Sequence, residues 1–160
     1  MYDNPYENSF LLLVRQYNNA IYKVCWMFAG RDAELVHDLY QEIVLRLWKG
    51  FQKYRPDDKD IYWIYKISLN TAISYKRKKT FFTQPLDKTA DNLATPEDTT
   101  SDDLYELINL LDPLDKTIIY LYLEQRSHEE ISQITGISAT NVGTKILRIK
   151  QKLKMMNDSQ

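Results

Sequence analysis

Residues 127–156 constrain the fold of this chain more than any other segment, because they predict two helices joined by a tight turn. Ser127 is a good N-cap residue, and Glu130 follows at the spacing of a capping box. Gly136 can adopt the left-handed conformation that ends a helix sharply, and Ser138 can cap the next helix. The apolar residues of that next helix recur at helical spacing: Val142, Ile146, Ile149 and Leu153. The segment therefore predicts a helix-turn-helix.

The side of the second helix away from this apolar stripe is polar and basic. A helix that packs by one face and presents such groups on the other fits the major groove of DNA. We expect Asn141 and Arg148 to contact base edges, since arginine to guanine is the commonest specific contact. Further DNA contacts are expected from Thr140, Thr144, Lys145 and Lys152, and from Arg126 and His128 near the start of the preceding helix. The alternative is an ordinary solvated basic helix.

The composition favours an all-α protein. Only 4 of the 160 residues are glycine and 5 are proline, and no segment of useful length alternates like a strand. The net charge of -1 argues at first against nucleic acid, but the charge is unevenly distributed. Residues 76–79 are all basic, residues 145–154 carry basic and no acidic side chains, and acids gather in 87–103. Local charge decides binding, because salt screens charges beyond about 10 Å.

The helical patterns predict two small helical domains joined by a flexible linker. The first domain, 1–80, has expected helices over about 7–29, 32–51 and 60–79. Residues 81–102 are acidic, contain two prolines and show little helical periodicity, as a flexible linker does. The second domain, 103–160, adds two short helices, separated at Asp112-Pro113, to the helix-turn-helix.

Several functional classes find no support in the residues. Cys25 is the single cysteine, so no internal disulfide can form, and His37 and His128 lie in no convincing metal-binding cluster. No phosphate-binding loop, nucleophile elbow or recognisable catalytic pair of carboxylates is present. We therefore expect no cofactor, no small-molecule substrate and no catalysis. Without a signal-peptide core or an apolar run that could span a bilayer, the chain is expected to be cytoplasmic.

Three segments together resemble a known family. Residues 38–48, DLYQEIVLRLW, are similar to the pattern D-x-x-Q-E-x-F-x-x-x-W, with Val44 in place of phenylalanine. Residues 63–70, WIYKISLN, precede a basic end. Residues 138–148 contain S-x-x-x-V-x-T-K-I-x-R, with Gly143 where the family often has a basic residue. In this order and spacing, the segments resemble a bacterial RNA polymerase sigma factor of the extracytoplasmic-function (ECF) group of the sigma-70 family.

The resemblance implies the parts of such a factor. A sigma-2-like domain of three or four helices would bind core RNA polymerase and the -10 promoter element. A sigma-4-like helix-turn-helix domain would read the -35 element, and the linker would thread towards the active-site channel of the polymerase. Family members are usually held by an anti-sigma protein, often membrane-bound. The implied function is to direct core polymerase to specific promoters and to initiate transcription.

The polymerase-binding surface is expected on the helix 32–51. Its polar side chains recur at three- and four-residue spacing around an apolar centre that can anchor a partner. In the family this surface grips a coiled coil of the largest polymerase subunits. The expected residues are Asp38, Gln41, Glu42, Arg46, Leu47 and Trp48, with the last two as anchors. The alternative is a solvated helix face, with Trp48 in the core.

The -10 surface is expected on the helix 60–79 and the loop before it. Promoter opening needs a pocket for an unstacked base, with aromatic or polar groups beside the single strand. Asn70 can pair with a base edge, and the loop resembles the family's loop that holds the flipped base. The expected residues are Arg55, Asp60, Trp63, Lys66, Asn70, Lys76 and Arg77, the cations being suited to phosphates. The ring of Trp63 could instead belong to the helix core.

Two other functions fit parts of the sequence. The chain could be a stand-alone helix-turn-helix regulator whose N-terminal helices form a dimerisation or sensing domain, which predicts tight duplex binding without polymerase. It could also be a helical adaptor whose basic helix binds an acidic protein, which predicts no salt-dependent affinity for DNA.

Overall fold

The computed structural model describes residues 4–54, 60–82 and 101–159, and for 76–82 and 101–102 it describes the backbone alone. Throughout this part of the chain the regular structure consists of α-helices, eight in all, which confirms the predicted all-α class. The chain divides into two compact units, Met1–Leu93 and Ala94–Gln160. Each unit has its own core, as the two-domain prediction requires, and each is described by itself.

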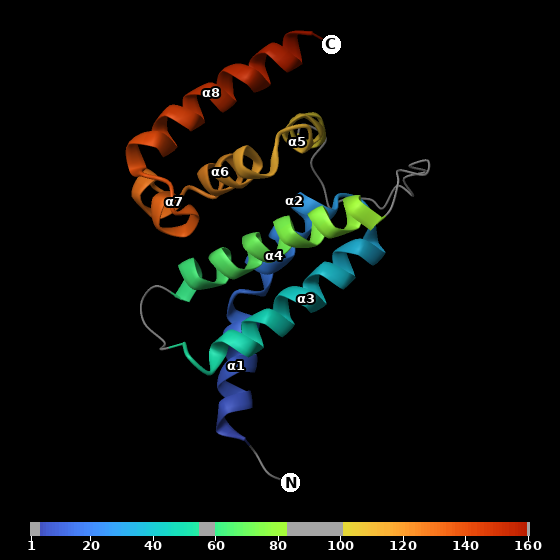
Figure 1. Cartoon of the computed structure of the whole chain (residues 1–160), viewed down its shortest axis with the longest axis vertical. Coiled ribbons are helices and arrows are strands. Elements are labelled where there is room, and N and C mark those ends of the chain that lie inside the picture. The colour runs from blue at the N-terminus through green and yellow to red at the C-terminus, as the bar shows by residue number, and fades with distance from the viewer. Residues whose placement is uncertain (1–3, 55–59, 83–100, 160) are drawn as a thin grey trace. The chain divides into compact units, whose positions relative to one another are not determined.

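The first unit consists of four helices: α1 (Pro5–Gln16), α2 (Asn18–Ala29), α3 (Ala33–Phe51) and α4 (Asp60–Phe82). Helices α2, α3 and α4 pack against one another, and α1 packs on α2 and α3 (Figure 1). The start of α3 is fixed locally, because the Asp32 side chain accepts a hydrogen bond of 3.1 Å from the Leu35 amide. The core includes the fully buried side chains Ile21, Val24, Cys25, Ile43, Leu47 and Ile64.

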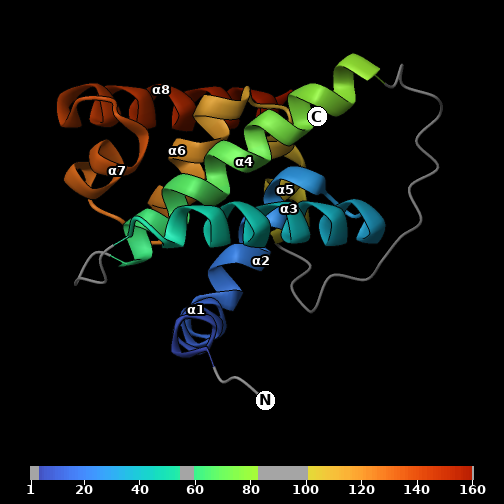
Figure 2. The ribbon, with the colours of Figure 1, turned by 60° about the horizontal axis from the view of Figure 1, so that its bottom comes forward.

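The second unit also consists of four helices: α5 (Ser101–Asn109), α6 (Pro113–Leu123), α7 (His128–Thr135) and α8 (Ala139–Asp158). Helix α8 packs against each of the other three, and Figure 2 shows α7 beside the first turns of α8. Its core includes the buried side chains Ile118, Leu121, Ile131, Val142 and Ile149. The Lys116 side chain is also buried, and its ammonium donates a hydrogen bond of 2.6 Å to the Asn109 side chain.

The predicted helix-turn-helix is confirmed as α7 and α8. The Ser127 hydroxyl accepts a hydrogen bond of 3.1 Å from the Glu130 amide, and the Ser138 hydroxyl accepts one of 3.3 Å from the Asn141 amide. Between the helices, Gly136 has a φ of 82°, the left-handed conformation that favours glycine. Three local signals in the sequence therefore fix both ends of the turn.

The prediction of one helix over residues 7–29 is wrong, because the chain leaves helical geometry at Tyr17, with φ -107° and ψ 16°. The Tyr17 amide closes α1 on the Leu13 carbonyl, and its own carbonyl accepts the first hydrogen bond of α2. Asn18 follows, a residue of poor helix propensity, and its side chain accepts a hydrogen bond of 2.7 Å from Tyr40 of α3. Because one residue separates the helices, the apolar periodicity continues across the break and conceals it.

Two helices reach into the predicted linker. Helix α4 continues to Phe82, and α5 begins at Ser101, so both ends of the predicted linker 81–102 are helical. Two acidic residues follow Ser101 in the sequence, and acidic residues favour the first turn of a helix. The rest of the predicted linker lies outside the described residues. The domain boundaries stay a prediction.

Candidate nucleic-acid-binding and protein-binding surfaces

Helix α8 separates an apolar face from a polar one. The apolar face is buried and consists of Val142, Ile146, Ile149 and Leu153. The opposite side carries exposed side chains at positions that share one face of a helix, and we call Thr140, Asn141, Thr144 and Arg148 the recognition face. Lys152, one turn beyond Arg148, is exposed as well. An amide and a guanidinium on an exposed helical face can form paired hydrogen bonds with base edges.

Two of the expected DNA-binding cations form ion pairs inside the second unit. The Lys145 ammonium lies 3.9 Å from the Asp115 carboxylate of α6. The Arg126 guanidinium lies 3.4 Å from the carboxylate of Glu130 on α7. Both cations are part-buried, so the fold fixes where their charges lie. The sequence analysis did not foresee either pair.

The electrostatic surroundings of Asp115 are mixed. Burial raises the pKa of this carboxyl, and the neighbouring carboxylate of Asp112 raises it further. Lys145 and Lys152 act in the opposite direction and lower the pKa. The net result is a raised pKa, so the charged form of Asp115 is held in an unfavourable site.

The His128 side chain lies against helix α8. His128 is the first residue of α7 and is exposed. A Cβ atom added to Gly143 of α8 would come within 3.3 Å of both Cε1 and Nδ1 of the His128 ring. The imidazole therefore packs on the bare backbone of α8 at Gly143.

Two of the residues expected to contact the -10 element lie four positions apart on α4. Lys66 and Asn70 are both exposed, and this spacing places them on the same side of the helix. Arg55 lies outside the described residues, and so do the side chains of Lys76 and Arg77.

Trp63 is half-buried and packs within the first unit. Its ring stacks on Tyr54, with centroids 4.1 Å apart and an interplanar angle of 14°. The Tyr54 hydroxyl in turn donates a hydrogen bond to the Asp60 carboxylate. A Cβ atom added to Gly50 of α3 would lie 3.3 Å from the Trp63 ring. The alternative expected for Trp63, a packing role, therefore holds for the part of the ring that faces Tyr54 and Gly50. Trp63 and Asp60 both contact Tyr54.

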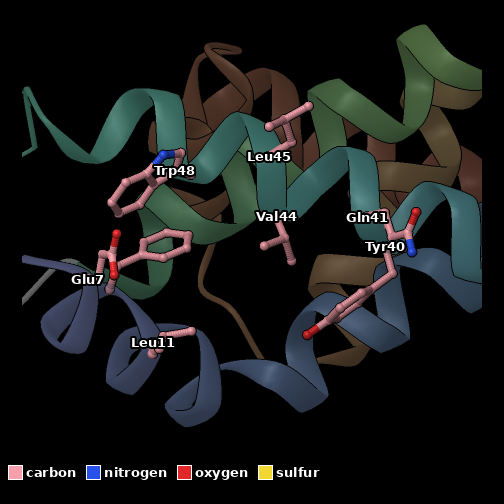
Figure 3. A pocket seen from close by; sticks show the side chains of 8 residues that line it. Glu7, Leu11, Tyr40, Gln41, Val44, Leu45 and Trp48 are labelled. Atoms are coloured by element: carbon pink, nitrogen blue, oxygen red, sulfur yellow. The ribbon is translucent and has the colours of Figure 1, made fainter. Parts of the chain in front are cut away.

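A groove of about 550 Å³ lies between α1 and α3 (Figure 3). Helix α1 contributes Glu7, Phe10 and Leu11 to the lining of the groove. Helix α3 contributes Tyr40, Gln41, Val44, Leu45 and Trp48. The Trp48 and Phe10 rings meet edge to face, with centroids 5.0 Å apart. The Leu11 and Leu45 side chains stay 53% and 46% exposed. Clustered exposed apolar side chains are typical of protein-interaction and ligand-binding surfaces. We call this the α3 groove.

The structure places the six expected polymerase-binding residues differently with respect to this groove. Gln41 and Trp48 line it. Asp38 is half-buried on the same helix, and Glu42 forms an ion pair of 3.3 Å with Arg46. Leu47 is fully buried in the core, so its expected role as a surface anchor is wrong.

The α1 side of the groove was missed by the sequence analysis. The run Leu11-Leu12-Leu13 carried a signal, because a helix with one buried stripe cannot bury three consecutive leucines. In the structure only Leu13 of the three is buried.

Two family models match this chain, and they match it in succession. "Sigma-70 region 2" matches residues 13–82, and "Sigma-70, region 4" matches residues 101–153. The first match covers α2, α3 and α4 with the end of α1, and the second begins with α5 and ends within α8. Each unit thus corresponds to one region of a single family. The chain belongs to the sigma-70 family. This sigma factor directs RNA polymerase to promoters.

Curated relatives of this sigma factor include members of the ECF group. RNA polymerase sigma factor SigV of Bacillus subtilis is 29% identical over 146 residues, which cover 89% of this chain and 86% of SigV. ECF RNA polymerase sigma factor SigE of Mycolicibacterium smegmatis is 26% identical over 89% of this chain, but the match spans only 59% of SigE. The ECF RNA polymerase sigma-E factor of Haemophilus influenzae is 24% identical, with 92% and 87% covered.

A solved structure has the same fold as this sigma factor. CnrH, in its complex with the cytosolic domain of CnrY, superposes with a TM-score of 0.70 over 96% of this chain and 90% of that chain, at 20% identity. Within the described residues of this sigma factor, no helix is long and apolar enough to cross a membrane. The same residues contain no group of three His, Cys, Asp or Glu side chains that could hold a metal ion.

Proposed function

We propose that this sigma factor acts in the cytoplasm through three separate surfaces. The α3 groove binds core RNA polymerase, the exposed side of α4 binds the -10 strand, and the recognition face of α8 reads the -35 duplex. The observation that carries the proposal is the recognition face: Asn141 and Arg148 are exposed on a helix whose other side is buried. The chain performs no catalytic step of its own and positions the polymerase on DNA.

The α3 groove supports polymerase binding because most of its lining is apolar and α3 also carries a charged pair. Leu11, Leu45 and Trp48 offer apolar area to a partner, and burial of such area is worth about 25 cal/mol per Å². The Glu42–Arg46 pair lies on the same helix and can fix the orientation of a polar partner. Aromatic and arginine side chains are the residues most enriched among binding hot spots.

On α4, Asn70 and Lys66 together can bind both parts of a nucleotide. The Asn70 amide can form paired hydrogen bonds to an unstacked base, and the Lys66 ammonium can meet a phosphate one helical turn away. We assign Trp63 a supporting role, since it stacks on Tyr54 at the start of the loop that follows α3. Asp60 supports the same loop through its hydrogen bond with Tyr54.

We also propose an anti-sigma partner for this chain. Its structural neighbour CnrH was solved in complex with the cytosolic domain of another protein, CnrY. A partner that inserts an apolar segment into the α3 groove would compete with polymerase for Leu45 and Trp48. Co-purification from native cells tests this proposal, and repeated isolation of the chain without such a partner would contradict it.

Run-off transcription tests the main proposal. Purified core polymerase should give promoter-specific transcripts with the chain and none without it. A gel-shift assay with and without core enzyme separates the alternatives. A stand-alone regulator would bind duplex promoter DNA tightly by itself, and an adaptor would add no salt-dependent DNA affinity even with polymerase.

A further inference from the structure

Gly143 is a glycine that its own backbone does not require. It lies within α8, where the chain is helical, and no left-handed conformation is needed there. In a helix interior only proline is less favourable than glycine, because glycine loses the most backbone freedom when the chain folds. A cause outside the helix backbone must therefore account for a glycine at this position.

The His128 imidazole supplies that cause. A methyl group at position 143 would press on the ring, because the added Cβ would lie 3.3 Å from two of its atoms. Carbon atoms in unstrained contact lie about 3.5–4.0 Å apart. The absence of a side chain at 143 is thus what allows the ring to rest directly on α8.

Two features fix the backbone position of His128. Its backbone follows the Ser127 cap, whose hydroxyl accepts the Glu130 amide hydrogen bond. Helix α7 is held on α8 by the buried side chains of Ile131 and Ile134. Thr140 of the recognition face lies one turn before Gly143 on α8, so the exposed imidazole sits at the edge of that face.

We propose that Gly143 is a positioning residue for promoter binding, acting through His128. The bare backbone at 143 holds the imidazole at the edge of the recognition face, where a ring N–H donates a hydrogen bond to a DNA phosphate. This inference rests on the proposed role of α8 at the -35 element. It assigns a function to a residue that makes no DNA contact itself.

The first test measures the ring position directly in Gly143→Ala. The chain has only 2 histidines, so the His128 imidazole resonances can be assigned by comparison with His37→Gln. We expect Gly143→Ala to shift the His128 ring resonances and leave those of His37 in place. The thermal midpoint of unfolding should rise, because alanine favours the helix. Unchanged His128 resonances would overturn the proposal.

The second test measures promoter affinity of the holoenzyme for Gly143→Ala, His128→Ala and the double variant. Loss of one phosphate hydrogen bond should weaken binding by about fivefold in His128→Ala, with a smaller loss in Gly143→Ala. The double variant should bind no worse than His128→Ala, because both changes remove the same contact. The loss should be equal across promoters that differ in the -35 sequence, as expected of a phosphate contact.

Gly50→Ala is the matched control. It also places a Cβ 3.3 Å from an aromatic ring, but that ring is Trp63 of the first unit. It should leave the His128 ring resonances in place, and its effect on promoter affinity should add to that of His128→Ala. Additive losses in the double variant, or a loss confined to one -35 base pair, would overturn the inference. If the wild-type chain supported no promoter-specific transcription, the proposed function itself would fail; a fully active Gly143→Ala holoenzyme would refute only the inference.

Discussion

The Lys145 ammonium of α8 lies 3.9 Å from the Asp115 carboxylate at the start of α6. A cation expected to bind DNA is therefore held by an acid of its own unit. The pair fixes the direction of the Lys145 side chain, and it also places a negative charge near the phosphates that α8 would approach. Removing the acid should therefore make the Lys145 side chain less ordered, but it should strengthen the electrostatic attraction between α8 and DNA.

Asp115→Asn should strengthen binding to -35 duplex DNA by about two- to fivefold at low salt, the range expected for one partly exposed charge. The repulsion of phosphate by Asp115 is lost, and Lys145 becomes available to DNA. Holoenzyme affinity for promoter DNA, measured over a series of salt concentrations, checks this. The control is Asp158→Asn, an exposed acid at the end of α8. A weaker Asp115→Asn complex would mean that orientation of Lys145 outweighs repulsion.

The stability of the same variant should depend on pH. Burial, and then Asp112, raises the pKa of Asp115 in the folded chain above its ordinary value of 3.8. The folded state then binds this proton more tightly than the unfolded state, so the favourable contribution is complete below pH 3.8. It is lost as the pH rises through the folded pKa. Asp115→Asn should thus be more stable than wild type at neutral pH, and denaturant unfolding at several pH values should show the gain vanish in acid.

Arg148→Ala should relax the preference for one -35 base pair and cost about 1–3 kcal/mol at that position. The guanidinium is exposed on the recognition face and can bind both acceptors of a guanine. Competition binding with a panel of -35 variants measures this. Lys154→Ala, an exposed cation farther along α8, serves as the control. Equal weakening on every sequence would identify Arg148 as a phosphate contact instead.

Asn70→Ala should slow promoter opening by roughly tenfold, since a lost base contact no longer offsets unstacking that costs a few kcal/mol. Permanganate reactivity of unpaired thymines in the -10 element follows the opening. Polymerase binding should be unchanged, because Asn70 is exposed on α4 and does not line the α3 groove. Loss of polymerase affinity in this variant would show that Asn70 has been assigned to the wrong surface.

Leu45→Lys should lower the affinity for core polymerase by at least about tenfold, because a partner would have to bury an unpaired charge. The side chain is 46% exposed, so the fold should tolerate the change. Leu12→Lys on α1 is the matched control, since Leu12 is 66% exposed and does not line the groove. Both variants should have wild-type thermal midpoints. If the two bound polymerase equally well, the α3 groove would not be the polymerase site.

Cys25 should not react with thiol reagents in the native protein. Burial raises the pKa of its thiol to about 12, which leaves almost no thiolate at neutral pH, and the side chain has no exposed surface. The rate of modification should therefore follow the rate of unfolding as denaturant is added. Rapid labelling of the folded chain at pH 7.5 would contradict this.

The features that the sequence predicts well are local. Ser127, Ser138 and Asp32 cap helices through hydrogen bonds to amides three residues away, so the signal and its effect lie in one turn. Gly136 likewise acts locally, because its own left-handed conformation ends α7. The helix-turn-helix could be predicted almost residue by residue for this reason.

The features that the sequence predicts poorly depend on distant packing. The α3 groove joins Leu11 to Leu45, and nothing in either helix alone indicates which leucine remains exposed. Leu47 was misplaced because its neighbour Trp48 lines the groove, whereas Leu47 lies four residues after Ile43 in the buried stripe. The Lys145–Asp115 ion pair was missed for the same reason as the groove, since it joins α8 to α6. The Arg126–Glu130 pair joins residues only four apart, so the sequence did carry a signal for it.

The close approach of His128 to Gly143 has a consequence for protein engineering. Alanine at position 143, in the helix interior, would gain about 1 kcal/mol of helix propensity. A laboratory selection for heat resistance alone would therefore enrich alanine at this site and displace the His128 ring. Proteins engineered in this way would survive higher temperatures while losing promoter activity, a known trade-off between stability and function.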